Sequence, residues 1–221
     1  YLCVRGRFQE ALERAEANLG HANSADDDGL RLVALLSIGS VYYPLADYQR
    51  SIDYLQQAVD LYTPGAWPEQ VYHYGHTPGL TAMSQQAVCL HLAGRSVEAL
   101  ARSERAVALA RETGHSHTVG MVLSMHSMLL MLMGRESEMR EVAGECLAFC
   151  QERGIFYWLM FTGMMMAWAC AEDDPAQVDT LAGTLDQFVM SGARQMATLF
   201  MYLLADACLR TGQLERCQAA L

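Results

Sequence analysis

The chain has 221 residues, of which 52% are hydrophobic, and its formal net charge is −10. This length and hydrophobic content predict a folded chain with a sizeable core and exclude intrinsic disorder. All fifteen basic residues are arginines, and the acidic balance argues against a nucleic-acid-binding face and against attraction to an anionic membrane. Seven cysteines are scattered through apolar stretches without the spacing of a disulfide framework, which predicts a reduced, cytoplasmic setting.

A short phrase recurs along the chain and marks it as a repeat protein. Each copy places a turn position five residues before a small or apolar residue, as with Gly94 and Ala99 in LAGRSVEAL. In chain order the six pairs are 6 and 11, 46 and 51, 94 and 99, 134 and 139, 173 and 178, and 212 and 217. The turn positions are separated by 40, 48, 40, 39 and 39 residues, so the period is near 40.

Helix signals flank each of these turns. The segment after the third turn has apolar residues at helical spacing and is predicted to end at Gly114, a residue suited to a left-handed C-cap. The next helix is predicted to begin at Ser116 or Thr118 and to reach Met133, and no stretch alternates as a strand does. We therefore expect an all-α chain: a right-handed α-solenoid of about five to six helix-turn-helix repeats. These should form a single domain, residues 1–221, within a longer multidomain protein.

Two long apolar runs, 119–133 and 155–171, raise the question of membrane insertion. They are fifteen and seventeen residues long, at or below the lower limit for a transmembrane helix. Neither has basic flanks of the kind that orient membrane spans. Both are better interpreted as helices buried inside a multilayer helical protein.

The segment LLSIGSVYYPLADYQRSIDYLQQAVDLY carries a recognisable set of residues: Gly39, Tyr42, Tyr48, Ser51 and Ala58. In this pattern it resembles a tetratricopeptide repeat. The glycine lies seven residues before the turn position, where the two helices of such a repeat pack closely and require a small side chain. The period near 40 exceeds the roughly 34 residues usual for the family, so longer helices or turns are expected.

Most of residues 70–221 carry a more particular resemblance. The segments YGHTPGLTAMSQQAVCLHLAGRSVEALARSERAVALARETGHSHT, FTGMMMAWACAE and SGARQMATLFMYLLADACLRTGQLERCQAAL are similar to C-terminal repeats of large bacterial signalling proteins. Those proteins join a class III nucleotidyl cyclase or a protein kinase to a STAND-type ATPase and then to such repeats. The resemblance implies that cyclase, kinase and ATPase chemistry lies outside this chain. In agreement, no G-x-x-x-x-G-K-[ST] phosphate-binding motif occurs.

Histidines near two predicted helix starts are the main candidates for a metal site: His73, His76, His115 and His117. Zinc held between neighbouring loops is one interpretation. The alternative, which we favour, is that each Gly-His pair connects one helix to the next, with Thr77 or Ser116 as the N-cap.

Other polar groups have simple structural interpretations. Cys146 and Cys150 share one helix face, which favours burial over redox chemistry. The acidic loops 24–29 and 171–176 lack the alternating ligand spacing of an EF-hand. No oriented Ser-His-Asp set is recognisable. We therefore predict no catalytic residue, no cofactor and no metal site, and the chain is not expected to be an enzyme.

The concave groove formed by the first helices of the repeats is the predicted binding surface. Counting from the closely packed position of each repeat selects groove residues that are largely apolar and Met-rich: Tyr43, Ser84, His91, Ser124, Met128, Met131, Tyr202 and Asp206. Such a surface suits an apolar helix, an apolar ligand or a neighbouring segment of the same protein. Alternatively, the methionines only fill the core of a tightly wound superhelix.

These features predict a non-catalytic interaction and regulatory module of a bacterial signalling protein. It would bind a protein or peptide partner, or hold its own effector domains in an inactive arrangement. The alternative is a small-molecule sensor, as in MalT-like regulators, with an inducer bound in the groove. We expect no nucleic acid and no membrane among its partners, and homo-oligomers formed through uncapped solenoid ends are a further expectation.

Overall fold

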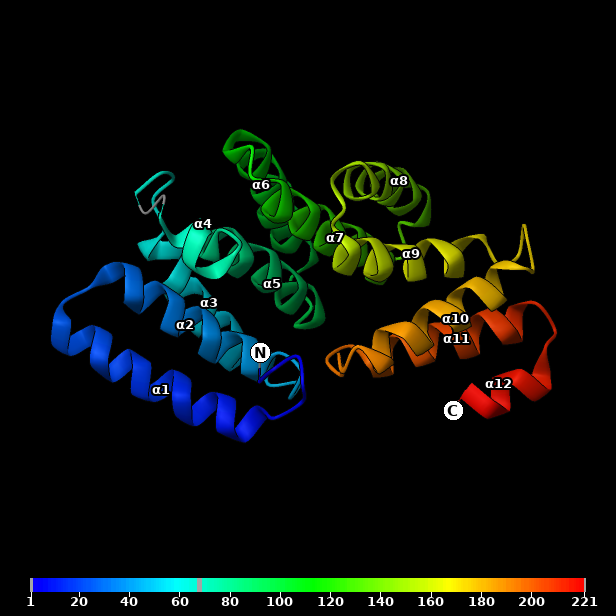
Figure 1. Ribbon diagram of the computed structural model, residues 1–221, viewed down its shortest axis with the longest axis horizontal. Helices are drawn as coiled ribbons and strands as arrows, with labels where there is room; N and C mark the ends of the chain where they lie inside the picture. Colours follow the sequence, from blue (N-terminus) through cyan, green and yellow to red (C-terminus); the bar gives the residue numbers. More distant parts are fainter. Residues whose placement is uncertain (1, 67–68, 221) are drawn as a thin grey trace.

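A computed structural model describes residues 2–66 and 69–220 (Figure 1). Within these residues every regular element is a helix and no strand is present, as predicted. The helices are α1 (Phe8–Ala25), α2 (Asp28–Tyr42), α3 (Tyr48–Leu61), α4 (Glu69–Tyr74), α5 (Pro78–Leu92), α6 (Ser96–Thr113), α7 (Ser116–Leu132), α8 (Glu136–Arg153), α9 (Phe156–Cys170), α10 (Gln177–Met190), α11 (Ala197–Arg210) and α12 (Leu214–Ala220). Tyr1 and Leu221, on which the expectation of uncapped ends rests, lie outside the described residues.

Most helices pair into hairpins that follow one another along an arc (Figure 1). The hairpins are α2–α3, α5–α6, α7–α8, α9–α10 and α11–α12, while α1 packs against α2 like the second helix of a preceding unit. The first helices α2, α5, α7, α9 and α11 contact one another in succession and form one layer, and the second helices pack against it. This arrangement is the α-solenoid of helix-turn-helix repeats that the sequence predicts.

The repeated phrase marks the turns of these hairpins. Five of the six predicted turn positions have the positive φ of a left-handed residue: Gly6 (74°), Ala46 (59°), Gly94 (85°), Gly134 (71°) and Gly212 (74°). The sixth position, in the acidic loop 171–176, does not, and that turn is longer. Glycine adopts positive φ without steric cost, so the alanine is the one residue of the five held there under strain.

Small residues bring the helices of a repeat close together, as predicted for Gly39. A Cβ atom on this glycine would lie 2.6 Å from Cγ of Leu55 on α3. The hydroxyl of Ser51 donates to the carbonyl of Gly39 at 2.8 Å and lies 3.3 Å from Sγ of Cys89 on α5. Three helices therefore meet at this point, and no larger side chain fits there.

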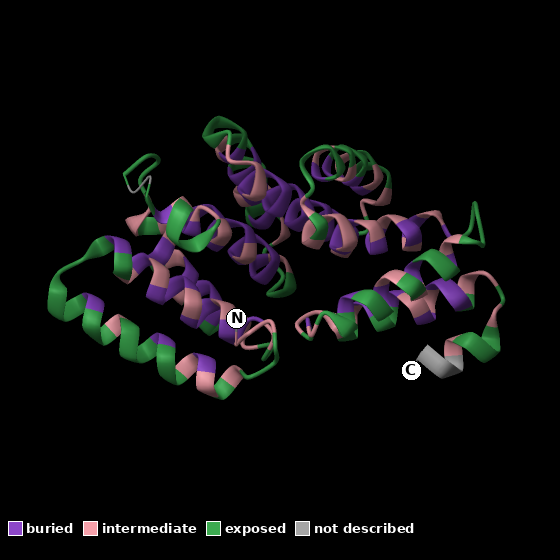
Figure 2. Cartoon of the chain, in the orientation of Figure 1, coloured by how far each residue is buried: buried purple, intermediate pink, exposed green. Residues whose placement is uncertain are grey.

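The first apolar run lies inside the solenoid, whereas the second, in α9, is buried on one face and leaves Phe156 72% exposed. Figure 2 shows continuous burial along α7, and every residue from Thr118 to Met131 is buried. The second helices α6 and α8 expose one face and bury the other. No helix in the described part of the chain combines the length and the apolar character needed to cross a membrane. All seven cysteines are free.

The N-terminal segment touches the loop between the last two hairpins. The carbonyl of Val4 accepts hydrogen bonds from the backbone N–H groups of Arg194, at 2.7 Å, and Gln195, at 3.1 Å. These residues belong to the loop between α10 and α11, which lies beside the N-terminal segment (Figure 1). A segment from the start of the chain thus closes the arc against the loop between the fourth and fifth hairpins.

Candidate functional site

Most of the eight predicted groove residues lie inside the protein. Tyr43, Ser84, Ser124, Met128 and Met131 are buried, His91 and Asp206 are half-buried, and Tyr202 is 60% exposed. The methionine at 128 has no exposed surface, so in this structure it fills the layer of first helices. None of the eight lines the cavity described below, and their role in binding stays a prediction.

Several of these side chains connect one repeat to the next. Ser124 Oγ on α7 is hydrogen-bonded to Thr162 Oγ1 on α9 at 2.6 Å. The imidazole of His91 donates from Nε2 to the carbonyl of Leu132 at 3.2 Å, while its Nδ1 contacts Ser96 Oγ at 2.9 Å. Buried polar groups in proteins are normally paired in this way. These contacts show that Ser124 and His91 join neighbouring repeats.

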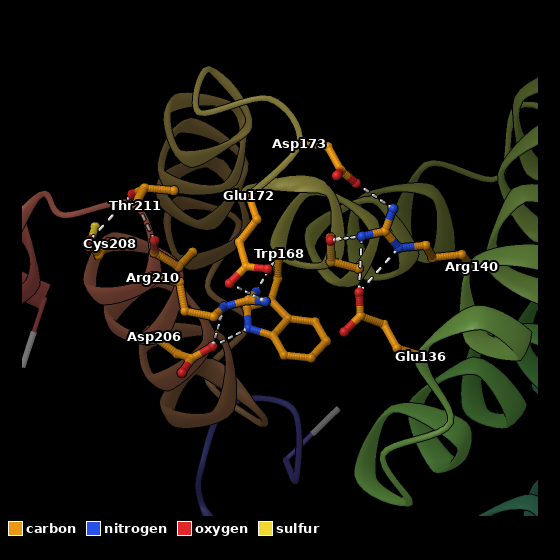
Figure 3. Close-up of polar contacts among 11 residues, drawn as sticks. Glu136, Arg140, Trp168, Glu172, Asp173, Asp206, Cys208, Arg210 and Thr211 are labelled. Atoms are coloured by element: carbon orange, nitrogen blue, oxygen red, sulfur yellow. Dashed lines mark hydrogen bonds and ion pairs between the residues drawn. The ribbon is translucent and has the colours of Figure 1, made fainter.

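Asp206 belongs to a polar network around the end of α9 (Figure 3). Its carboxylate accepts from Trp168 Nε1 at 2.7 Å and pairs with Arg210 Nε at 3.0 Å. The same guanidinium donates to the Trp168 carbonyl at 2.7 Å. Arg140 on α8 donates to the Ala169 carbonyl and pairs with Asp173 at 2.8 Å. Two arginines thus cap the carbonyls of α9, a favourable position for cations.

The network also accounts for the acidic loop 171–176, which lacks the ligand spacing of an EF-hand. Glu172 lies 3.8 Å from Arg210, and Asp173 pairs with Arg140. Arginines from two neighbouring helices therefore neutralise part of the loop and hold the one turn that lacks a left-handed residue.

The cysteine pair and the histidines also make internal contacts. Cys146 and Cys150 are buried with their sulfurs 3.9 Å apart, and this contact together with burial raises the pKa of Cys146. His117 accepts from Trp158 Nε1 on α9 at 3.2 Å. No group of three or more metal-ligating side chains comes together within the described residues.

The predicted N-caps are partly wrong. Helix α7 begins at Ser116, but its N-cap is His115, whose Nδ1 accepts from the N–H of Thr118 at 3.3 Å. Thr77 does occupy the N-cap position of α5, yet its side chain accepts no capping hydrogen bond.

The longest interval between turns, the 48 residues from position 46 to position 94, contains an inserted segment, residues 62–77. It carries the short helix α4 and borders a cavity of about 670 Å³. The described lining consists of residues 62–65, 70–72, 77, 109 and 112–115, from the end of α3, the inserted segment and the end of α6. Insertions in repeat proteins map to loops that often form the binding face. We take this cavity as the candidate functional site and call it the insertion pocket.

One wall of the insertion pocket is fixed by a glycine. Tyr62 follows the last residue of α3, and its ring packs directly on Gly79 of α5. A Cβ at this glycine would lie 2.2 Å from Cγ and Cδ2 of the tyrosine and 2.7 Å from its Cβ. Only a glycine allows the ring to lie here without moving the chain.

Hydrogen bonds anchor the inserted segment on both sides. The side chain of Gln70, in α4, donates to the carbonyl of Gly29 at the start of α2 at 3.1 Å. At the other end, the N–H of Thr77 donates to Thr118 Oγ1 of α7 at 3.0 Å. The segment is therefore held against two first helices, and the pocket has a defined shape.

The electrostatic surroundings of the pocket are acidic. Glu112 is exposed at the end of α6, and its charge adds to burial in raising the pKa of Tyr62. Burial lowers the pKa of His115, which favours the neutral imidazole. The neighbouring Arg111 is engaged outside the pocket, where it donates to both carboxylate oxygens of Glu145 at 2.7 and 2.9 Å.

Fold and site together define the class: a helical-repeat solenoid with a surface pocket at an insertion. Residues 32–63 match the family model of the tetratricopeptide repeat, which covers the α2–α3 hairpin and confirms the resemblance of that segment. No curated protein matches the chain significantly.

Solved structures with similar folds extend the comparison to the whole chain. A Rap protein complexed with competence and sporulation factor aligns over 100% of this chain with a TM-score of 0.72 and 15% identity. The chain spans 60% of the length of that protein. A kinesin light chain-type protein from Podospora anserina, with nearly identical TPR-like repeats, aligns over 86% of this chain and 91% of its own length. Its TM-score is 0.56 and its identity 17%. At these identities the likeness concerns the fold.

Proposed function

We propose that this chain is a non-catalytic interaction module that binds a segment of a protein partner. The observation that carries the proposal is the insertion pocket on an α-solenoid of helical hairpins, with Tyr72 in its lining 88% exposed. Repeat solenoids of this kind commonly bind partners through extended surfaces and their inserted loops. The similar Rap protein was solved in complex with competence and sporulation factor, which adds support.

The proposed setting is cytoplasmic signalling in bacteria, with residues 1–221 as one domain of a longer protein. The resemblance of residues 70–221 to the repeats of cyclase–ATPase and kinase–ATPase fusions supports this setting. The hydrogen bonds from Arg194 and Gln195 to Val4 support a single domain, because they join the N-terminal segment to the loop between α10 and α11. The partner segment can then belong to another protein or to an effector domain of the same chain.

A small-molecule sensor is the second candidate. A cavity of about 670 Å³ is within the range of small-ligand sites, which favours this alternative. Such sites bury most of the ligand, however, whereas Tyr72, Glu112 and Gly114 in the lining are exposed. The open rim favours a protein segment that leaves part of its surface in water.

A peptide-display selection tests the proposal. The folded chain is used to select from a random peptide library, and enriched peptides are measured by fluorescence anisotropy beside scrambled versions. We expect saturable binding that the scrambled peptides lack. A selection without any saturable binder would overturn the proposal. Stabilisation of the chain by a compound from a metabolite panel, without peptide binding, would replace it by the sensor function.

A further inference from the structure

The insertion pocket contains a charge that the fold leaves uncompensated. Among the described lining residues, Glu112 is the one carboxylate and no arginine is present, and the lowered pKa of His115 favours its neutral form. Within the described residues no arginine or histidine lies within ion-pair distance of this carboxylate. Arg111, the adjacent basic residue, is already bound to Glu145.

The ends of four helices line the insertion pocket. Helix α3 ends at Leu61 and α6 ends at Thr113, and the residues at both ends line the pocket. A helix C-terminus carries a partial negative charge of roughly half a unit and favours cations within its last turn. Thr77 and His115, the N-caps of α5 and α7, also line the pocket and bring partial positive charges of similar size. The four helix ends therefore largely offset one another, and Glu112 supplies the net charge of the lining.

Aromatic rings supply the second element. Tyr62, held in place by Gly79, and the exposed Tyr72 both line the cavity. The face of a tyrosine ring attracts ammonium and guanidinium groups. The chain uses this contact internally, where the guanidinium of Arg50 lies 4.7 Å from the ring centre of Tyr42.

We propose that the insertion pocket binds an arginine or lysine side chain of a basic segment in the partner protein. This inference rests on the proposed function and names the chemistry that its site recognises. The cavity is much larger than one side chain, so the flanking backbone of the segment lies along residues 62–65 and 70–72. Charge complementarity with an acidic chain, of net charge −10, favours a basic partner over an acidic one.

The test uses Nα-acetyl-arginine amide as the probe and Nα-acetyl-citrulline amide as its neutral counterpart. Both are titrated into ¹⁵N-labelled protein at low ionic strength, and amide shifts are recorded by NMR. We expect saturable shifts confined to residues 62–65, 70–72 and 109–115 with the arginine probe, and much weaker ones with citrulline. Shifts elsewhere only, or equal shifts with both probes, overturn the proposal.

Exposed side chains allow variants that keep the fold. Glu112→Gln removes the ion pair with the arginine probe and should lower the affinity for this probe about two- to fivefold. Tyr72→Ala removes one exposed cation–π contact and should cost a similar factor, about two- to fivefold. If the two act independently, the double variant loses about tenfold. Unchanged affinity in the double variant contradicts the proposal.

Matched controls use Glu104→Gln and Tyr202→Ala. Glu104 is an exposed carboxylate on α6 away from the pocket, and Tyr202 is an exposed tyrosine on α11. Neither substitution should change the affinity for the arginine probe, and a loss with Tyr202→Ala would point to the predicted groove instead. Peptides from the display selection separate the two proposals. If these peptides bind, but their affinity changes neither with the double variant nor when citrulline replaces their arginines, this inference fails while the proposed function stands.

Discussion

Replacing Gly79 by alanine should disrupt the wall of the insertion pocket that Tyr62 forms. The new Cβ would lie 2.2 Å from two ring carbons of Tyr62 and 2.7 Å from its Cβ, so rotating the ring away does not remove the clash. The end of α3 must move. Overpacking of this kind costs about 1–3 kcal/mol. For a chain of this length that corresponds to a melting temperature lower by roughly 2–12 °C.

Thermal unfolding followed by far-UV circular dichroism measures the loss, and Gly183→Ala is the matched control. Gly183 is an exposed residue within α10, and a Cβ there meets nothing within 4 Å. Helix propensity then predicts a gain of up to about 1 kcal/mol for the control. The Gly79→Ala variant should also bind the arginine probe more weakly, because Tyr62 is displaced. Equal or higher stability of Gly79→Ala would refute the packing argument.

Three further predictions concern the turns, pH and the closed arc. Ala46→Gly should raise the free energy of unfolding by about 0.5–1 kcal/mol, because glycine adopts the positive φ at this turn without strain. Gly94→Ala should lower it by a similar amount. Urea unfolding measures both changes, and the reverse signs would contradict the turn assignment. Burial lowers the pKa of His76 from 6.5 to about 4, so the unfolded chain binds a proton that the folded chain does not. Stability should fall as the pH drops from 6.5 towards 4, by on the order of 1–3 kcal/mol, and His76→Asn should flatten this slope in unfolding measured across that range. Removing residues 1–5 deletes the contact between Val4 and Arg194, so small-angle scattering should give a larger radius of gyration at unchanged helicity; an unchanged radius would show that the contact does not close the arc.

The hairpin turns could be predicted from sequence because their requirement is local. A left-handed residue between two helices favours glycine, and four of the five such positions have it. The turn near Asp173 differs because it is held by Arg140 and Arg210, which lie more than thirty residues away in either direction. Contacts of this range leave no mark in a local pattern.

The candidate site could be predicted only in part. Spacing placed Met128 on the face that lines the groove in a typical repeat, but whether that face is open depends on how closely successive repeats pack. Here Ser124 is hydrogen-bonded to Thr162 of the next repeat, and Met128, one helical turn further along α7, is fully buried. The interval of 48 residues was the available signal for the insertion pocket. The packing of Tyr62 on Gly79, which shapes the pocket, required coordinates.

The location of the insertion pocket follows from which side chains the solenoid uses to pack its repeats together. Nearly all of α7 is buried, and hydrogen bonds join the first helices of neighbouring repeats. The side chains of the first helices therefore contribute to stability. Within the segment 62–77, hydrogen bonds hold Gln70 and Thr77, and between them Tyr72 is 88% exposed. The segment can therefore change its recognition chemistry without a cost to the core. Glu112, the acidic side chain of the described lining, is exposed at such a place, so its replacement tests recognition of a cation at little cost to folding.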